Sequence, residues 1–195
     1  MAEYADLTQT GEKSVIMFYG LPATGKTTVS RKIRDSLETE TNVDLISTFR
    51  IREELDLTDL HSAEQRETVY REVTRRLEYY LARKEVRCII LDGNFNKKKR
   101  RVVSYTLAEN RAAQVYIIEC KISSKEELER RLEERKKHPE LLEHKATGMD
   151  LYEMIKNSTD LIEEDLKERP NLVIVTINTE TNELNVRSNG TLYSY

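Results

Sequence analysis

A short segment near the N-terminus combines two glycines, one lysine and two threonines at a spacing that suits phosphate chemistry. Residues 15–19 are all apolar, and they lead directly into Gly20-x-x-x-x-Gly25-Lys26-Thr27. An apolar strand followed by this spacing is the Walker A pattern, in which backbone N–H groups surround phosphate oxygens. The residues that we expect to contact a nucleotide are Gly20, Leu21, Pro22, Ala23, Thr24, Gly25, Lys26, Thr27 and Thr28.

Each residue type in this segment suits a separate task. Gly20 and Gly25 let the backbone bend tightly and approach phosphate oxygens, where a Cβ atom would obstruct. Lys26 is a mobile positive charge for the β- and γ-phosphates, and the Thr27 hydroxyl is placed to bind Mg²⁺. An ordinary glycine turn with a chance lysine is the alternative. The apolar strand before the segment and the helical spacing after it favour a nucleotide triphosphate site.

Asp92 is a second candidate, because it ends another apolar run, residues 88–91. A carboxylate at the carboxyl end of a parallel strand lies beside the phosphate loop, where it can hold magnesium or accept a proton from a hydroxyl. The alternative is a turn formed by the pair Asp92-Gly93. Asn94 either bonds a substrate or caps the helix that follows.

Positive charge gathers at three further places. Arg131 and Arg135 are four residues apart, so they share a helix face and suit the charge on a transferred phosphoryl group. Ion pairs with the neighbouring glutamates are the alternative. The basic run 97–101 is either a solvated helix face or a clamp for an anionic acceptor, and Arg52 follows the second strand. We therefore predict a catalytic set of Lys26, Asp92, Arg131 and Arg135, a metal set of Thr27 and Asp92, and an acceptor-binding set of Arg52, Asn94, Lys97 and Arg101.

Apolar runs alternate with helical spacings along the chain. We expect strands over residues 15–19, 43–47, 87–91, 114–120 and 172–177, and a further short strand over 184–187. Helices are expected from 26 to 37, from 62 onward with Ser62 as cap, over 97–111, after Ser123 as cap, and over 150–167. Residues 49–61 are charged and irregular, with one helical turn and a loop expected there. This order predicts an α/β three-layer sandwich of the P-loop NTPase type, with a five-stranded parallel sheet and helices on both faces.

The composition limits the class of protein. The chain has 195 residues, with 38% hydrophobic and 34% charged, and its net charge is −3. This charge argues against a globally basic coat for nucleic acid, although a local basic groove stays open. No apolar run approaches membrane-spanning length and the acidic N-terminus lacks a signal-peptide core, so we expect a cytoplasmic protein without a membrane partner. Cys88 and Cys120 lie in apolar runs and are expected to be buried, reduced thiols.

Four segments in order resemble the small P-loop kinases that phosphorylate a hydroxyl group. They are Gly-Leu-Pro-Ala-Thr-Gly-Lys-Thr-Thr, Ile-Ile-Leu-Asp-Gly-Asn-Phe, Arg-Arg-Leu-Glu-Glu-Arg and Ala-Thr-Gly-Met-Asp-Leu-Tyr-Glu-Met, and the likeness spans residues 13–178. Related members are polynucleotide 5′-hydroxyl kinases, seryl-tRNA kinases and the kinase domain of 6-phosphofructo-2-kinases. The resemblance implies ATP as donor, Mg²⁺, and a hydroxyl-bearing acceptor that is a small molecule or the end of a nucleic acid. We expect a flexible polar lead over 1–12, the kinase domain over 13–179, and a C-terminal extension over 180–195 that forms a short strand or a tail.

The sequence departs from this family at one position. Many members carry an aspartate three residues before the arginine that matches Arg52, and Phe49 stands there in this chain. The base is then Asp92, or absent, or supplied by Glu53 or Asp56. A nucleotide-hydrolysing switch without a phosphoryl acceptor is therefore the alternative to a kinase.

Overall fold

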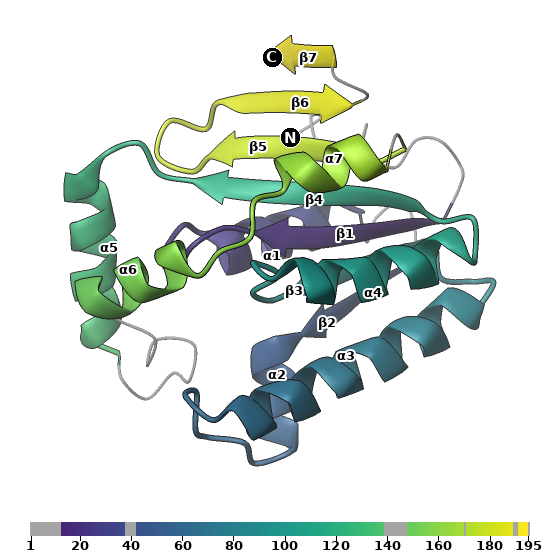
Figure 1. The fold of residues 1–195 in the computed structure, drawn as a ribbon, viewed down its shortest axis with the longest axis horizontal. Helices are drawn as coiled ribbons and strands as arrows, with labels where there is room; N and C mark the ends of the chain where they lie inside the picture. Colours follow the sequence, from purple (N-terminus) through teal and green to yellow (C-terminus); the bar gives the residue numbers. More distant parts are fainter. Residues whose placement is uncertain (1–12, 38–41, 139–147, 170, 189–190, 195) are drawn as a thin grey trace.

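The fold is built around one seven-stranded sheet with helices on both of its faces (Figure 1). The computed structural model describes residues 13–37, 42–138, 148–169, 171–188 and 191–194. The strands are β1 (Ser14–Tyr19), β2 (Val43–Ser47), β3 (Cys88–Asp92), β4 (Gln114–Lys121), β5 (Val173–Asn178), β6 (Leu184–Ser188) and β7 (Thr191–Ser194). The lead predicted over residues 1–12 lies outside the described residues.

The strand order β2-β3-β1-β4-β5-β6-β7 places β1 between β3 and β4. The five strands β1 to β5 pair in parallel, as the alternation of strands and helices predicts. β6, the short strand expected over 184–187, and β7, which was not expected, extend the five parallel strands in antiparallel pairing beyond β5. β2 and β3 lie on one side of β1, and β4 and β5 lie on the other. The strand order therefore reverses at β1, and α/β sheets bind ligands at such a switch point.

Seven helices connect these strands within the described residues: α1 (Lys26–Leu37), α2 (Thr48–Glu54), α3 (Ala63–Ala82), α4 (Lys98–Glu109), α5 (Lys125–Lys136), α6 (Met149–Asn157) and α7 (Glu163–Glu168). α3, α4 and α7 lie in front of the sheet in Figure 1, and α1 lies behind it. None of the helices in the described ranges is long and apolar enough to cross a bilayer.

Three local predictions differ from the structure. Residues 48–54 form α2, which Ser47 caps and which is longer than the one helical turn that we expected in this segment. Ser124 rather than Ser123 caps α5, since its hydroxyl accepts from the Glu127 amide at 3.3 Å. The helix predicted over 150–167 is broken into α6 and α7, because the Asp160 amide donates to the carbonyl of Asn96 instead of continuing the helix.

The strands of the sheet alternate their side chains between two cores. Val15 and Met17 of β1 face a core closed by α3, α4 and α7, while Ile16 and Phe18 face the core under α1. This period of two is the signature of a strand buried on both faces. Cys88 and Cys120 are buried and free, as expected.

A third, smaller cluster joins the loop after β1 to α5 and α6. Ala23 of the loop packs with Leu128 and Leu132 of α5, and Met149 and Tyr152 of α6 border the same cluster. Apolar contact therefore fixes the position of the loop relative to the two helices that follow β4.

Candidate active site

The loop between β1 and α1 requires glycine at two of its positions. Gly20 has a φ of 143°, and a Cβ atom placed on it would lie 2.5 Å from the backbone oxygen of Cys120. Gly25 has a φ of 87°, also in the region that favours glycine. Both observations agree with a loop whose backbone is bent for close approach to a phosphate.

Lys26 lies over the loop that precedes it. Its Nζ atom donates to the carbonyl oxygens of Gly20 at 2.8 Å and Leu21 at 2.7 Å. Burial lowers the pKa of Lys26 to about 8, and the positive charge of Arg135 acts in the same direction. A lysine in this setting is stabilised in its charged form by any anion that binds at the loop.

The hydroxyl of Thr27 and the carboxylate of Asp92 meet at the start of α1. Thr27 Oγ1 and Asp92 Oδ1 are 3.4 Å apart, and Asp92 is 4% exposed at the carboxyl end of β3. A hydroxyl and one carboxylate are hard oxygen donors, and this small set fits Mg²⁺, which takes its other ligands from water and substrate phosphates. In the described part of the chain no group of three His, Cys, Asp or Glu side chains offers a metal site.

Arg131 and Arg135 border a cavity of about 390 Å³ between α1 and α5, which Gly25, Thr27 and Thr28 also line. Arg131 is held in place by Glu127 at 2.6 Å and by the hydroxyl and carbonyl oxygens of Thr179 at 2.8 and 2.9 Å. The two arginines thus face the phosphate loop, as their shared helix face predicts. Arg131 also forms the ion pair that we considered as its alternative role.

Thr179 is a site residue that the sequence did not single out. Its hydroxyl donates to the carbonyl of Thr24 in the loop at 2.9 Å and accepts from Arg131. Thr179 directly follows β5, so it stands at the same carboxyl edge of the sheet as Asp92. That position after a strand was the signal available in the sequence.

A second cavity, of about 480 Å³, opens between α2, α3, the β3–α4 loop and α6. We call it the basic cavity, because its wall carries Arg52, Arg66, Lys97, Lys99 and Arg100, and Glu67 is the one acidic side chain among its described lining residues. Three of the four predicted acceptor-binding residues, Arg52, Asn94 and Lys97, line it. Phe49 lines it as well.

The prediction that Arg101 binds an acceptor is wrong. Arg101 is 0% exposed and forms a buried ion pair with Asp165 of α7, with Nε 2.5 Å from Oδ2. Its NH1 and NH2 groups donate to the carbonyls of Phe95 and Leu161. Helix α4 turns this guanidinium away from the basic cavity and into the core, where it joins α4 to α7.

The rest of the basic run also divides among different partners. Lys97 donates to the carbonyl of Ser158 and lies 3.5 Å from Asp160, while Lys98 pairs with Glu168 at 2.7 Å. Lys99 pairs with Glu67 at 2.9 Å. The run is therefore neither a uniform solvated face nor a single clamp.

Asn96 connects the β3–α4 loop to the phosphate loop. Its Oδ1 atom accepts from the Gly20 amide at 3.3 Å, and its side chain is 4% exposed. Asn96 also lines the basic cavity, so one residue contacts both regions of the site. The sequence pattern singles out Asp92 at the end of β3 and Asn94 in this loop, and it gives no sign of the role of Asn96.

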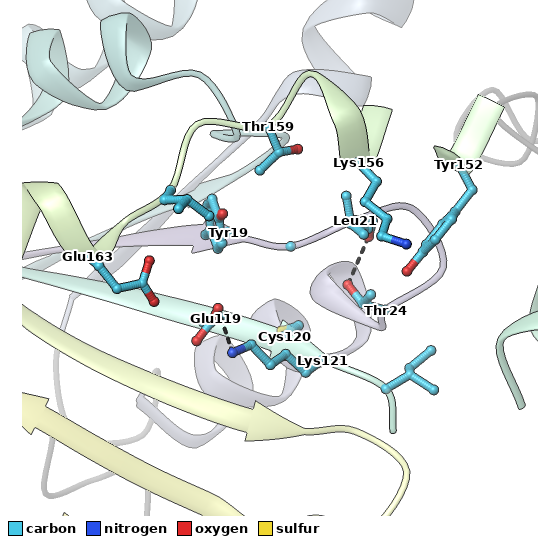
Figure 2. Close-up of a pocket in the computed structure, with 13 residues that line it drawn as sticks. Tyr19, Leu21, Thr24, Glu119, Cys120, Lys121, Tyr152, Lys156, Thr159 and Glu163 are labelled. Atoms are coloured by element: carbon cyan, nitrogen blue, oxygen red, sulfur yellow. Dashed lines mark hydrogen bonds and ion pairs between the residues drawn. The ribbon is translucent and has the colours of Figure 1, made fainter. Parts of the chain in front are cut away.

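A third cavity, of about 330 Å³, borders Gly20, Leu21 and Thr24 from the side of β4 and α6 (Figure 2). Glu119 in its wall is 4% exposed and accepts from Thr176 at 2.7 Å and from Arg187 at 3.0 Å. Burial raises the pKa of Tyr19 to about 12, and the charge of Glu119 adds to this rise. These acidic and phenolic groups already have partners within the fold.

The parallel sheet, the glycine loop and the lysine at the start of α1 define a P-loop α/β domain with a kinase-like fold, and such a fold implies nucleotide binding. The family model described as AAA domain matches residues 15–157, and the chain belongs to that family. A search of curated proteins gives no match.

Solved structures share the fold at low sequence identity. The chain is similar to APE1195, at 21% identity and a TM-score of 0.62 over 88% of each chain. It is similar to Kti12 of Chaetomium thermophilum in complex with ADP-AlF3, at 17% identity and a TM-score of 0.62 over 83% of this chain and 88% of that one. A gluconokinase from Sinorhizobium meliloti 1021 is similar at 12% identity and a TM-score of 0.53, over 85% and 83% of the two chains.

Proposed function

We propose that this protein is an ATP-dependent kinase that transfers the γ-phosphoryl group to a hydroxyl on a small molecule or a nucleic-acid end. The observation that carries the proposal is the meeting of Thr27 and Asp92, 3.4 Å apart at the start of α1. Asn94, two residues after Asp92, lines the basic cavity, so we expect an acceptor bound there to direct its hydroxyl toward the carboxylate. A site for hydrolysis alone has no need of such a cavity.

The donor side uses the loop and the residues around it. The backbone of residues 20–28 and the charge of Lys26 bind the phosphates, and Arg135 adds positive charge near Lys26. Thr27 and Asp92 would hold Mg²⁺, which when bound neutralises charge on the β- and γ-phosphates. Arg131, through its bonds to Thr179, holds α5 against the loop.

The acceptor side uses Asp92 as the proton acceptor. The acceptor oxygen bonds to the γ-phosphorus, the bond from that phosphorus to the β,γ-bridging oxygen breaks, and ADP leaves. The hydroxyl proton passes to the Asp92 carboxylate. Glu53 and Asp56, the other candidates for the base, are exposed, whereas Asp92 is buried at the end of β3 and contacts Thr27 of the phosphate loop, which favours Asp92.

A nucleotide-hydrolysing switch is the second candidate, and Phe49 favours it. This ring lines the basic cavity at the position where many related kinases carry an aspartate. A site that lacks this carboxylate positions an acceptor hydroxyl less firmly.

Labelled ATP separates the two candidates. We would incubate the protein with Mg²⁺, γ-labelled ATP and a panel of sugars, sugar phosphates, nucleosides and 5′-hydroxyl oligonucleotides, and follow the label. The proposal expects label in at least one acceptor, at a rate above that of inorganic phosphate release. Label found only in inorganic phosphate for every acceptor would support the switch and contradict the kinase.

A further inference from the structure

Three arginines meet in the basic cavity around one aromatic ring. Arg100 of α4 stacks on the Tyr70 ring, with its guanidinium carbon 3.8 Å from the ring centroid. Arg52 of α2 and Arg66 of α3 line the same cavity. Burial raises the pKa of the Tyr70 hydroxyl, and the positive charges of Arg100, Arg52 and Arg66 all oppose that rise. All three arginines and Tyr70 thus line one cavity, and Arg100 contacts the ring directly.

These arginines form no ion pair with a carboxylate of the described residues, although Lys99, and after it Arg100 and Arg66, lower the pKa of the nearby Glu67 carboxyl. Arg52 donates to the carbonyls of Leu57 and Asp59, both at 3.3 Å. Arg66 donates to the carbonyls of Leu60 and His61, and no described carboxylate lies within ion-pair distance of Arg52, Arg66 or Arg100. Glu67, the acidic residue in the wall, pairs with Lys99 at 2.9 Å.

Two further observations, on the burial of Arg52 and on the Nε atom of Arg100, support an anion-binding role for this cluster. Arg52 is 7% exposed, and burial lowers its pKa, with the charge of Arg66 acting in the same direction. The Nε atom of Arg100 is buried and has no hydrogen-bond partner among the described residues. Like charges held together at a cost to the free protein are stabilised when an anion binds between them.

We propose that the accepting molecule carries a phosphate group of its own, which binds between Arg52, Arg66 and Arg100 beside the Tyr70 ring. This inference rests on the proposed kinase function and names the class of its acceptor: a phosphate ester that also bears a free hydroxyl. A cavity of about 480 Å³ holds one sugar phosphate or one terminal nucleotide, and not a folded nucleic acid. Planar guanidinium groups bind phosphate oxygens in pairs, which suits a phosphate better than a neutral sugar.

Matched pairs of probes test this acceptor class by binding, independently of turnover. Isothermal titration in the presence of Mg²⁺ and AMPPNP would compare ribose 5-phosphate with ribose, fructose 6-phosphate with fructose, and a 5′-hydroxyl dinucleotide with and without a 3′-phosphate. At least one phosphorylated member is expected to bind tenfold or more tightly than its partner. The sugar and dinucleotide pairs distinguish a metabolite from a nucleic-acid end as the source of the phosphate.

Charge-removing variants locate the phosphate. Arg66→Gln and Arg100→Gln should each weaken binding of the preferred probe about tenfold, a change typical of one lost charge-assisted contact, and leave AMPPNP affinity unchanged. The controls are Arg75→Gln on the exposed face of α3, where Arg75 pairs with Glu72, and Lys98→Gln, which removes the pair with Glu168. Both controls should bind the probe as the parent protein does.

The outcomes separate the acceptor class from the kinase function. Equal affinity within every pair, no binding of any phosphorylated probe, or equal losses in Arg66→Gln and Arg75→Gln would overturn the phosphate site. Transfer of label to uncharged acceptors alone would also overturn it while leaving the kinase intact. Tight, Arg66-dependent binding of a phosphorylated probe that never receives label would support the phosphate site and contradict the kinase.

Discussion

Gly20 shows how strictly the first turn of the phosphate loop limits the residue that occupies it. Its φ of 143° is unfavourable for any side chain, and an added Cβ would lie 2.5 Å from a backbone oxygen, that of Cys120. Backbone atoms of a central strand cannot move aside as a flexible side chain can. The close packing of β4 against this turn therefore fixes the path of the loop.

We expect Gly20→Ala to weaken nucleotide binding at least tenfold and to destabilise the fold by about 1–3 kcal/mol or more. The backbone strain at this φ and the steric clash of the new Cβ with the Cys120 oxygen both contribute to this cost. Titration with ADP and urea unfolding measure the two effects. Gly148→Ala is the matched control, since Gly148 has a φ of 103° with nothing within 4 Å of an added Cβ. Equal ADP affinity in Gly20→Ala and the parent protein would contradict the role given to this turn.

At the scale of elements, the α4–α7 contact is the most buried polar connection among the described residues. Arg101 and Asp165 are both 0% exposed, and Tyr105 of α4 donates to the same Asp165 oxygen at 2.7 Å. Burial raises the pKa of the Tyr105 hydroxyl, and its bond to the Asp165 carboxylate adds to this rise. This contact holds α7 on the sheet beside the β3–α4 loop that carries Asn94 and Asn96.

We expect Asp165→Asn to lower the free energy of unfolding by about 3–5 kcal/mol, because it leaves the Arg101 charge buried without its partner. Urea unfolding followed by circular dichroism measures the change. Glu164→Gln, at a side chain with 67% exposure on the same helix, should change it by less than about 0.5 kcal/mol. A loss below about 1 kcal/mol in Asp165→Asn would show that the pair contributes little.

The positions of Lys26 and Asp92 can be read from the sequence, because each depends on its own neighbours: a loop spacing for Lys26 and a strand end for Asp92. Their catalytic roles stay predictions. Arg101 was placed wrongly because its partner lies 64 residues away and five adjacent basic residues give no sign of which one turns inward. The packing of α4 against α7 decides which of these residues is buried.

The residues that line the basic cavity could not be assigned from the sequence for the same reason, which is that their role depends on tertiary packing. Val69 and Val73 are four residues apart, a spacing that places them on one face of α3, and both are in the core. Arg66 and Tyr70 lie on the same helix, but their role depends on how α2 and the β3–α4 loop meet α3 in space. The parallel sheet was predicted because strand periodicity is local, whereas β7 lies in a segment without a strong pattern.

For the whole molecule, the parallel strands bring the two halves of the site to one edge of the sheet. Lys26 and Thr27 follow β1, Asp92 ends β3, and Thr179 follows β5. The cavity between α1 and α5 and the basic cavity lie at this edge; Thr27 lines the first, and Asn94, two residues after Asp92, lines the second. This arrangement is the physical basis for proposing transfer of a phosphoryl group.

The most direct test of that proposal is the turnover of Asp92→Asn with the preferred acceptor. We predict a fall in kcat of about 100-fold or more, because Asn can neither take the hydroxyl proton nor supply the charge that Mg²⁺ requires. ADP affinity without Mg²⁺ should stay unchanged, and Asp35→Asn, at an exposed aspartate that pairs with Arg34, should keep full activity. Unchanged turnover in Asp92→Asn would contradict the proposed mechanism.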